Sequence, residues 1–207
     1  MRGTPSYDER QDFGYQSTSL ASAAMTFPRP HGPWQIHSRA TVYRDPWIEV
    51  DRDEVTRPDG APGSHCIVRL LPGVSVLALD DQQQVYLTED FHYGVGRETL
   101  ELVSGGIDPG EDAAGAARRE LAEELGITAQ TWTDLGVCDP FTTIVVSPTR
   151  LFLARDLAFG PTSAEGTERI RCRKLPLSEA VQQVLHSRIT HGPSCVLILK
   201  VARMLGA

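Results

Sequence analysis

The 207-residue sequence lacks the features of a membrane protein or of a small disulfide-stabilised domain. No apolar run approaches the length of about 18 residues that a membrane-spanning helix needs, and the N-terminus has no basic segment followed by an apolar one. The four cysteines are widely spaced and form no CxxC pair; they are Cys66, Cys138, Cys172 and Cys195. We therefore expect a soluble, cytoplasmic protein with reduced thiols in or near its core, and neither a zinc site nor a disulfide framework.

Positive charge is also in short supply. Lys and Arg number 20 against 27 Asp and Glu, which gives a net charge of −7 and a pI near 5.3. An acidic protein is repelled by nucleic acid and by anionic membranes, so we expect neither as a partner. With 41% hydrophobic residues and no internal repeat, the chain can bury one good core and support a small extra N-terminal sheet.

Acidic side chains are concentrated in one loop and in the helix predicted to follow it. Residues 105–111 read GGIDPGE, and residues 119–127 read RELAEELGI. Asp112 is suited to cap the start of a helix and Gly126 to end it, so we predict a helix over residues 113–125. Its expected core stripe is Ala113, Ala117, Leu121 and Leu125.

Three glutamates of this helix, Glu120, Glu123 and Glu124, share one face because they stand at i, i+3 and i+4. Two carboxylates roughly 5–6 Å apart repel by about 3 kcal/mol at an effective dielectric of 20, so we expect a cation beside them. A hard divalent ion, Mg²⁺ or Mn²⁺, is favoured because it accepts carboxylate oxygens. The alternative is a solvated helix face whose glutamates pair with Arg118 and Arg119.

The spacing of these residues resembles the signature of the Nudix hydrolases. It runs from Gly105 over five residues to Glu111 and over seven more to Arg119-Glu120, followed by Glu123-Glu124 and Gly126. The resemblance implies an α/β protein with a Nudix-type α/β/α sandwich, a mixed sheet and, in this chain, a small N-terminal antiparallel β extension. It also implies hydrolysis of a pyrophosphate with Mg²⁺ or Mn²⁺ as the cofactor.

The same resemblance implies a metal site. Its members are Glu120, Glu124, Glu123, Glu111 and the backbone carbonyl of Ser104. Glu120 and Glu124 are its core ligands, and Glu123 joins them. Glu111 ties the loop to Arg119 and supports the residues that bind the ion.

Beyond this motif, the chain from about residue 34 to its C-terminus resembles the ADP-ribose pyrophosphatase-like branch of the family. The resemblance is carried by residues 43–47, 58–60, 100–102, 151–155 and 165–170. Enzymes of this branch split a nucleoside diphosphate linked to another group into a nucleotide and a phosphorylated product. ADP-ribose or a nucleotide sugar is therefore the expected substrate.

The branch also implies catalytic and substrate-binding residues. The catalytic set is Glu168, Glu123, Glu120 and Arg119, and the substrate-binding set is Trp47, Glu101, His92 and Gly105. Glu168 best matches a late-loop glutamate that activates the attacking water, with Glu165 second; a surface ion pair with Arg169 or Arg171 is the alternative.

Two of the assigned substrate-binding residues have other readings. His92 stands where the branch usually has a phosphate-gripping arginine, and a histidine lacks that bidentate fork. Trp47 is a candidate for base stacking, but a tryptophan in a strand can equally be a core residue.

The remaining pattern divides the chain into a mobile tail (residues 1–33), an N-terminal β extension (residues 34–60) and a Nudix hydrolase domain (residues 61–207). Strands are expected at residues 34–37, 40–43, 47–50, 64–70, 75–79, 85–89, 100–103, 132–137 and 151–154, and helices at 177–187 and 193–205. Short strands gain a core by crossing to a partner chain, so we expect a homodimer built through residues 34–55.

Two other functions stay open. A non-catalytic Nudix-fold sensor would bind a nucleotide and regulate a partner, but such sensors commonly lose carboxylates of the motif, and none is lost here. A housecleaning hydrolase of damaged nucleoside triphosphates is disfavoured by the N-terminal extension and by the approach to the loop at residues 100–102.

Overall fold

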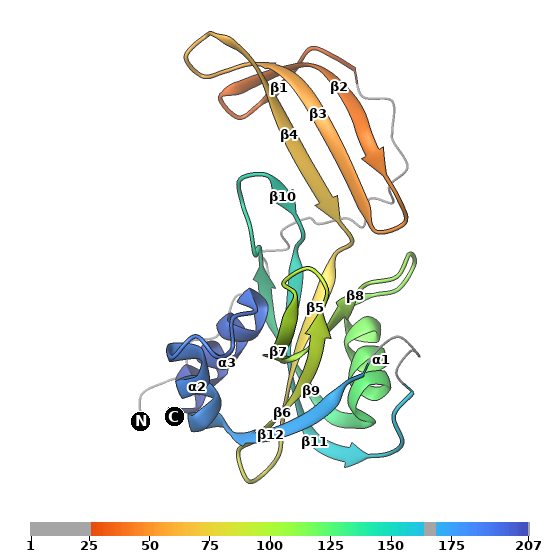
Figure 1. Ribbon diagram of the computed structural model, residues 1–207, viewed down its shortest axis with the longest axis vertical. Helices are drawn as coiled ribbons and strands as arrows, with labels where there is room; N and C mark the ends of the chain where they lie inside the picture. The colour runs from red at the N-terminus through yellow and green to blue at the C-terminus, as the bar shows by residue number, and fades with distance from the viewer. Residues whose placement is uncertain (1–25, 164–168, 207) are drawn as a thin grey trace.

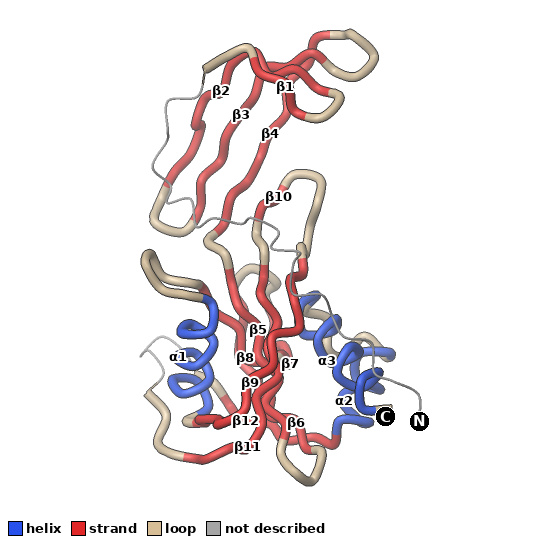
Figure 2. Tube along the Cα trace, turned by 180° about the vertical axis from the view of Figure 1, so that it is seen from behind, coloured by secondary structure: helices blue, strands red, loops and turns tan. Residues whose placement is uncertain are grey.

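The computed structural model describes residues 26–163 and 169–206 and contains two β-sheets, one beyond the end of the other (Figure 1). The first sheet has the order β1-β2-β3-β4-β10 and comprises β1 (Arg29–His31), β2 (Trp34–Arg44), β3 (Ile48–Thr56), β4 (Pro62–Leu70) and β10 (Val145–Val146). It stands beyond the rest of the molecule in both views (Figures 1 and 2). The chain enters the second sheet directly after β4.

The second sheet forms the centre of an α/β/α sandwich. Its strands are β5 (Gly73–Leu79), β6 (Gln84–His92), β7 (Arg97–Glu101), β8 (Val103–Gly106), β9 (Ile127–Cys138), β11 (Thr149–Phe159) and β12 (Arg171–Pro176). The order is β12-β6-β5-β11-β9, with β7 beside β6 and β8 beside β5. Because β11 is parallel to β5 and antiparallel to β9, the sheet is mixed, as the sequence predicts.

Helices cover both faces of this sheet. Helix α1 (Ala113–Leu125) lies on one face, and α2 (Leu177–Leu185) and α3 (Gly192–Leu205) lie on the other (Figures 1 and 2). Successive residues of a strand point to opposite faces. In β5, Val74 and Val76 accordingly pack in the cluster under α1, whereas Leu77 and Leu79 pack in the cluster under α2 and α3. The sandwich architecture expected from the sequence is thereby confirmed.

The first sheet buries charge on one of its faces. Alternate residues of β3, Glu49, Asp51 and Asp53, are buried, and arginines of the neighbouring strands pair with them. Arg39 donates to both carboxylate oxygens of Asp53, at 2.7 and 2.8 Å. Arg44 pairs with Glu49 at the other end of the row. Paired in this way, the carboxylates can be buried without an uncompensated charge.

The last part of the expected tail forms a strand, whereas residues 1–25 of that tail lie outside the described residues. Residues 1–33 are expected to be a tail, but β1 pairs with the start of β2, from Arg29 opposite Ile36 to His31 opposite Trp34. A tight turn allows this, since Gly32 has φ of 56°, which a glycine adopts at little cost. The sheet also continues past residue 60 into β4, so the expected end of the extension falls in the turn between β3 and β4.

The cysteines and the edge strand β12 give two further corrections. All four cysteines are free, but Cys66 and Cys172 are exposed, and only Cys138 and Cys195 pack against the core. Strand β12 is absent from the expected elements because its start reads Arg-Cys-Arg-Lys and is mostly exposed. Pairing along β6 stabilises this charged edge, which its own hydrophobicity does not predict.

Across residues 26–163 and 169–206, no helix is long and apolar enough to cross a membrane.

Candidate active site

Helix α1 has the boundaries that the sequence predicts. The Asp112 carboxylate accepts the backbone N–H of Gly115 at 2.6 Å and caps the first turn. Gly126 ends the helix with φ of 62° and donates its N–H to the carbonyl of Ala122 at 2.9 Å. These two caps fix the register of the helix and therefore the direction in which its glutamates point.

The carboxylate of Glu120 packs directly on Gly105. A β-carbon added to Gly105 would come within 2.0 Å of both the carboxyl carbon and one oxygen of Glu120. Strand β8, which carries Gly105, is held against β5 with Gly105 opposite Val74. A glycine is therefore required here so that the helix carboxylate can approach the strand backbone.

A single guanidinium organises the acidic groups of the loop and the helix. Arg119 grips Glu111 with two hydrogen bonds, of 3.1 and 2.9 Å, and its Nη1 reaches Glu120 at 2.8 Å and Glu123 at 3.2 Å. Its Nη2 also donates to the carbonyl of Gly106 at 2.9 Å. These contacts raise the pKa of Arg119, with Glu111 as the main cause, and hydrogen bonding to Arg119 lowers the pKa of Glu111.

The guanidinium of Arg119 is thus one cation that lies beside the helix glutamates, as expected from their mutual repulsion. Arg119 does pair with glutamates, as the solvated-face alternative holds, whereas Arg118 lies 5.3 Å from the centre of the Trp132 ring instead. Arg119 thus contacts three carboxylates of the loop and the helix, those of Glu111, Glu120 and Glu123, and Glu124 follows Glu123 in α1.

This donor set suits a hard divalent ion, because such ions select carboxylate and carbonyl oxygens. The described part of the chain contains no group of three or more His, Cys, Asp or Glu side chains already gathered around one point. The side chain of Glu123 is 41% exposed whereas that of Glu120 is 13% exposed, so solvent reaches the site from the side of Glu123.

The start of the late loop is tied to the C-terminal end of α1. Gly160 donates its N–H to the carbonyl of Gly126 at 2.7 Å, and Ser163 donates to the carbonyl of Glu123 at 3.0 Å. Gly126 also lies so close to Gly160 that a β-carbon would come within 2.3 Å of its carbonyl oxygen. The assigned residues Glu168 and Glu165 lie outside the described residues, but the segment that leads to them starts beside the helix glutamates.

Two of the assigned substrate-binding residues lie next to each other. His92, the last residue of β6, has its Nε2 3.6 Å from a carboxylate oxygen of Glu101, the last residue of β7. The other oxygen of Glu101 lies 3.3 Å from Nδ1 of His191, a residue to which the sequence analysis assigns no role. No spacing rule could have identified His191, because it is 90 residues from Glu101 in the chain.

Trp47 is not a core residue. It is 69% exposed in the turn between β2 and β3, where its backbone N–H donates to the Asp45 carboxylate at 2.8 Å. The next residue, Ile48, pairs with Leu70 at the end of β4. Because the carbonyl of Pro72 accepts the N–H of Ile107 at 2.9 Å, Trp47 lies at the end of the first sheet that is nearer to the Gly105 loop.

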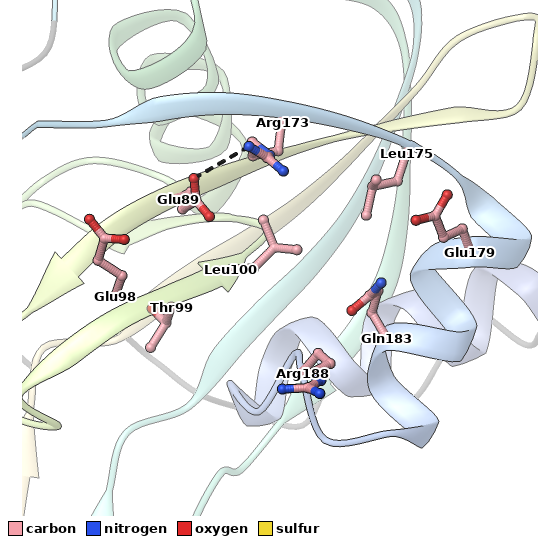
Figure 3. A pocket seen from close by; sticks show the side chains of 9 residues that line it. All are labelled: Glu89, Glu98, Thr99, Leu100, Arg173, Leu175, Glu179, Gln183 and Arg188. Atoms are coloured by element: carbon pink, nitrogen blue, oxygen red, sulfur yellow. Dashed lines mark ion pairs between the residues drawn. The ribbon is translucent and has the colours of Figure 1, made fainter.

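A cavity of about 310 Å³ opens between the sheet and α2, away from these carboxylates (Figure 3). It is lined by Glu89, Glu98, Thr99, Leu100, Arg173, Leu175, Glu179, Gln183 and Arg188. Arg173 and Glu89 form an ion pair of 3.7 Å across one wall. The lining residues come from β6, β7, β12, α2 and the segment after α2, so this cavity is separate from the Gly105 loop and α1.

Comparisons with known families agree with this geometry. Residues 69–184 match the family model described as the NUDIX domain, which covers the Gly105 loop, α1 and the whole second sheet. Residues 34–68 match the model described as the nucleoside diphosphate sugar hydrolase N-terminal domain. That second match covers β2, β3 and most of β4.

Individual relatives span most of the chain. The CMP-5'-(N-acetyl-N-hydroxy-3-aminopropyl)phosphonate hydrolase of Streptomyces rubellomurinus is 30% identical and covers 84% of each chain. The ADP-ribose pyrophosphatase of Mycobacterium tuberculosis is 28% identical over 79% of this chain and 81% of its own. A crystal structure of an ADP compounds hydrolase superposes with a TM-score of 0.71 and 23% identity, over 89% of this chain and 97% of that one, which shows a shared fold.

Proposed function

The chain belongs to the Nudix hydrolase family and is a hydrolase of phosphoric anhydride bonds, and we propose that it cleaves a nucleoside diphosphate joined to another group. ADP-ribose and nucleotide sugars are the leading substrates. The products are a nucleotide and a phosphorylated partner. The two named relatives act on compounds with different bases, CMP-linked in one and ADP-linked in the other, so both the base and the attached group have to be varied in a test.

One observation carries this proposal: the Glu120 carboxylate rests on the backbone of Gly105 while Arg119 links it to Glu111. This contact places a carboxylate at the start of a loop whose backbone groups can approach a phosphate closely. Non-catalytic sensors of this fold commonly lose carboxylates of the motif, and Glu111, Glu120, Glu123 and Glu124 are all present here, which supports an enzyme.

We assign a divalent ion, Mg²⁺ first and Mn²⁺ second, to the carboxylates of α1. Glu120 and Glu124 would hold it, with Glu123, the carbonyl of Ser104 and Glu111 in support. When bound, such an ion neutralises charge on the pyrophosphate and acidifies a water molecule. The gathering of the Glu111, Glu120 and Glu123 carboxylates around Arg119 supports the assignment.

The chain's own residues would orient the groups and move the proton. Arg119 fixes the carboxylates of Glu111 and Glu120, so they need little rearrangement during the reaction. Water attacks phosphorus, its proton passes to Glu168, and the bond from that phosphorus to the bridging oxygen breaks, so that the second phosphate leaves. Ser163, five residues before Glu168 in the chain, donates its backbone N–H to the carbonyl of Glu123 at 3.0 Å, which supports this assignment.

We also propose a homodimer formed through the first sheet. Val42, Tyr43 and Trp47 are large apolar side chains left more than half exposed there. A partner chain that covered them would give this sheet a second layer, and Trp47 could then stack on a substrate base.

Four free thiols are compatible with a cytoplasmic location.

The test is a substrate screen with product identification. Purified protein with Mg²⁺ is incubated with ADP-ribose, UDP- and GDP-sugars, CMP-linked compounds and nucleoside triphosphates, and the products are separated by chromatography. A nucleoside monophosphate with its phosphorylated partner is the expected outcome. Faster turnover of triphosphates would favour the housecleaning reading, and tight binding without turnover would favour a sensor.

A further inference from the structure

Leu102 joins two strands that lie beside different neighbours in the second sheet. β7 ends at Glu101 and pairs with β6, whereas β8 begins at Val103 and pairs with β5. The single residue between them, Leu102, is 1% exposed and is a register partner in neither pair. Because a buried peptide group needs hydrogen-bond partners, the N–H and C=O of Leu102 have to find theirs outside these ladders.

Two serine hydroxyls supply these partners. The Oγ of Ser194 accepts the backbone N–H of Leu102 at 2.9 Å, and the Oγ of Ser104 donates to the carbonyl of Leu102 at 3.0 Å. Ser194 is fully buried in the first turn of α3, 92 residues away in the chain. Its Oγ also lies 2.8 Å from Nδ1 of His191, the N-cap residue of α3. The start of α3 is thereby joined to the point where the chain passes from β7 to β8.

A third serine contacts the hydroxyl of Ser104. Ser75 on β5 is the register partner of Ser104, and their Oγ atoms lie 3.0 Å apart. A hydroxyl carries one hydrogen, so when Ser104 gives its own to Leu102, the hydrogen in the contact with Ser75 comes from Ser75. Ser75 is fully buried between Val74 and Val76, which pack under α1, so its side chain points to the opposite face of the sheet. The three hydroxyls therefore act from the face that α2 and α3 cover.

Strand β8 has few side chains that can hold it in place. Its four residues end in two glycines, so its side-chain contacts come from Val103, which packs under α1, and from Ser104. Its backbone is also closely confined. The Glu120 carboxylate lies against Gly105 on the side of α1, and a β-carbon on Gly73 of β5 would come within 3.1 Å of the Gly105 carbonyl oxygen. A small shift of β8 would therefore be felt at the carboxylate.

We propose that Ser75 and Ser194 are positioning residues, which hold β8 in place and thereby set the affinity of the site for its divalent ion. They act through the hydroxyl of Ser104 and the peptide groups of Leu102. This rests on the proposed function for the ion and for the Ser104 carbonyl as one of its ligands. Groups that orient the ligands of a metal ion typically change its affinity by about 10- to 100-fold when they are removed.

The experiment measures the binding of Mn²⁺ alone to the full chain, without nucleotide, by EPR. Ser194→Ala removes the acceptor of the Leu102 N–H, and Ser75→Ala removes the partner of the Ser104 hydroxyl. Each substitution should raise the Kd for Mn²⁺ about tenfold. In turnover of ADP-ribose, the Mg²⁺ concentration that gives half the maximal rate should rise by a similar factor. KM for ADP-ribose at saturating Mg²⁺ should stay within about twofold of the wild type.

Two further variants separate positioning from a general loss of stability. Val201 is fully buried in the same helix as Ser194 and belongs to the core cluster under α2 and α3. Val201→Ala should therefore lower the melting temperature in chelator, as the serine variants do, but leave the Kd for Mn²⁺ unchanged. Ser75→Thr keeps the hydroxyl on a residue type that suits a strand, so it should bind Mn²⁺ nearly as the wild type does.

A wild-type Kd for Mn²⁺ in both alanine variants would overturn the proposal, as would an equal loss of affinity in Val201→Ala. A Ser75→Thr protein that binds Mn²⁺ no better than Ser75→Ala, or a wild type that binds no Mn²⁺, would also reject it. If no nucleotide is hydrolysed but the two alanine variants alone lose Mn²⁺ affinity, the proposed function fails and this inference stands. If nucleotides are hydrolysed and the alanine variants bind Mn²⁺ as the wild type does, the inference fails and the proposed function stands.

Discussion

Gly105 and Glu120 are in direct contact: the carboxylate of the helix residue occupies the space where a β-carbon of the strand residue would lie, 2.0 Å away. Because the group displaced by a larger residue is the end of a flexible side chain, a substitution at Gly105 can be accommodated by moving the carboxylate. The contact therefore links one backbone position to the alignment of the reaction site.

Gly105→Ala should fold with nearly wild-type thermal stability but lose about 10²-fold in kcat, since a misplacement of about 1 Å in a catalytic group has an effect of that order. Gly106→Ala is the control. A β-carbon at Gly106 would contact one methyl group of Leu71 at 3.9 Å, so this variant should be mild. Steady-state kinetics and thermal melts distinguish the two, and equal activities would contradict the role given to the contact.

Glu124→Gln should leave the fold intact and lower turnover by several orders of magnitude, because a neutral amide binds Mg²⁺ poorly. Activity of the wild type should disappear in excess chelator and return with Mg²⁺ or Mn²⁺. The measurement is the initial rate as a function of metal concentration. Near-wild-type hydrolysis by the variant at saturating Mg²⁺ would remove Glu124 from the mechanism.

Glu168→Gln should reduce kcat by about 10²- to 10⁴-fold with a smaller change in metal requirement, since its proposed task is to accept the proton of water. Glu165→Gln, in the same loop, should be mild and serves as the control. If the effects are exchanged, the assignment within this loop is wrong by three residues. If neither substitution changes kcat, the glutamates of α1 and their metal ion suffice to activate the water.

Glu111→Gln should destabilise the protein at neutral pH and not in acid. The hydrogen bond from Arg119 lowers the pKa of Glu111 below its usual value of 4.5 in the folded protein. The stability that this hydrogen bond gives the wild type is therefore complete above pH 4.5. It disappears as the pH falls through the lowered pKa of Glu111. Urea unfolding in chelator at pH 7 and at acid pH measures it. Glu54→Gln, which disrupts an exposed pair with Arg52, should show little difference at either pH.

The protein should be a dimer at micromolar concentration by light scattering. Truncation before Asp59 removes β1–β3 and should abolish assembly and weaken substrate binding. Trp47→Ser probes the same surface without removing the sheet, and it should raise KM more than it lowers kcat if the indole stacks on a base. A monomeric wild type with full activity would contradict this arrangement.

Local signals made α1 predictable from the sequence. Asp112 and Gly126 mark its ends, and the contact between Glu111 and Arg119 follows from the motif spacing. The further partners of Arg119 depend on side-chain geometry that spacing does not define. His191 reaches Glu101 only through the folded arrangement of α3 and β7, and β12 is a charged edge strand whose hydrogen bonds come from β6. Long-range packing determines such features, so a single sequence does not show them.

The link between α1 and the late loop has a consequence for evolution and engineering. The two hydrogen bonds that Gly160 and Ser163 donate, to the carbonyls of Gly126 and Glu123, use backbone atoms alone. Most of the loop sequence can therefore diverge without changing the point from which the loop departs. Loops exchanged between relatives at these two residues should keep their attachment to α1, so substrate preference could be transplanted there while the glutamates of α1 remain untouched.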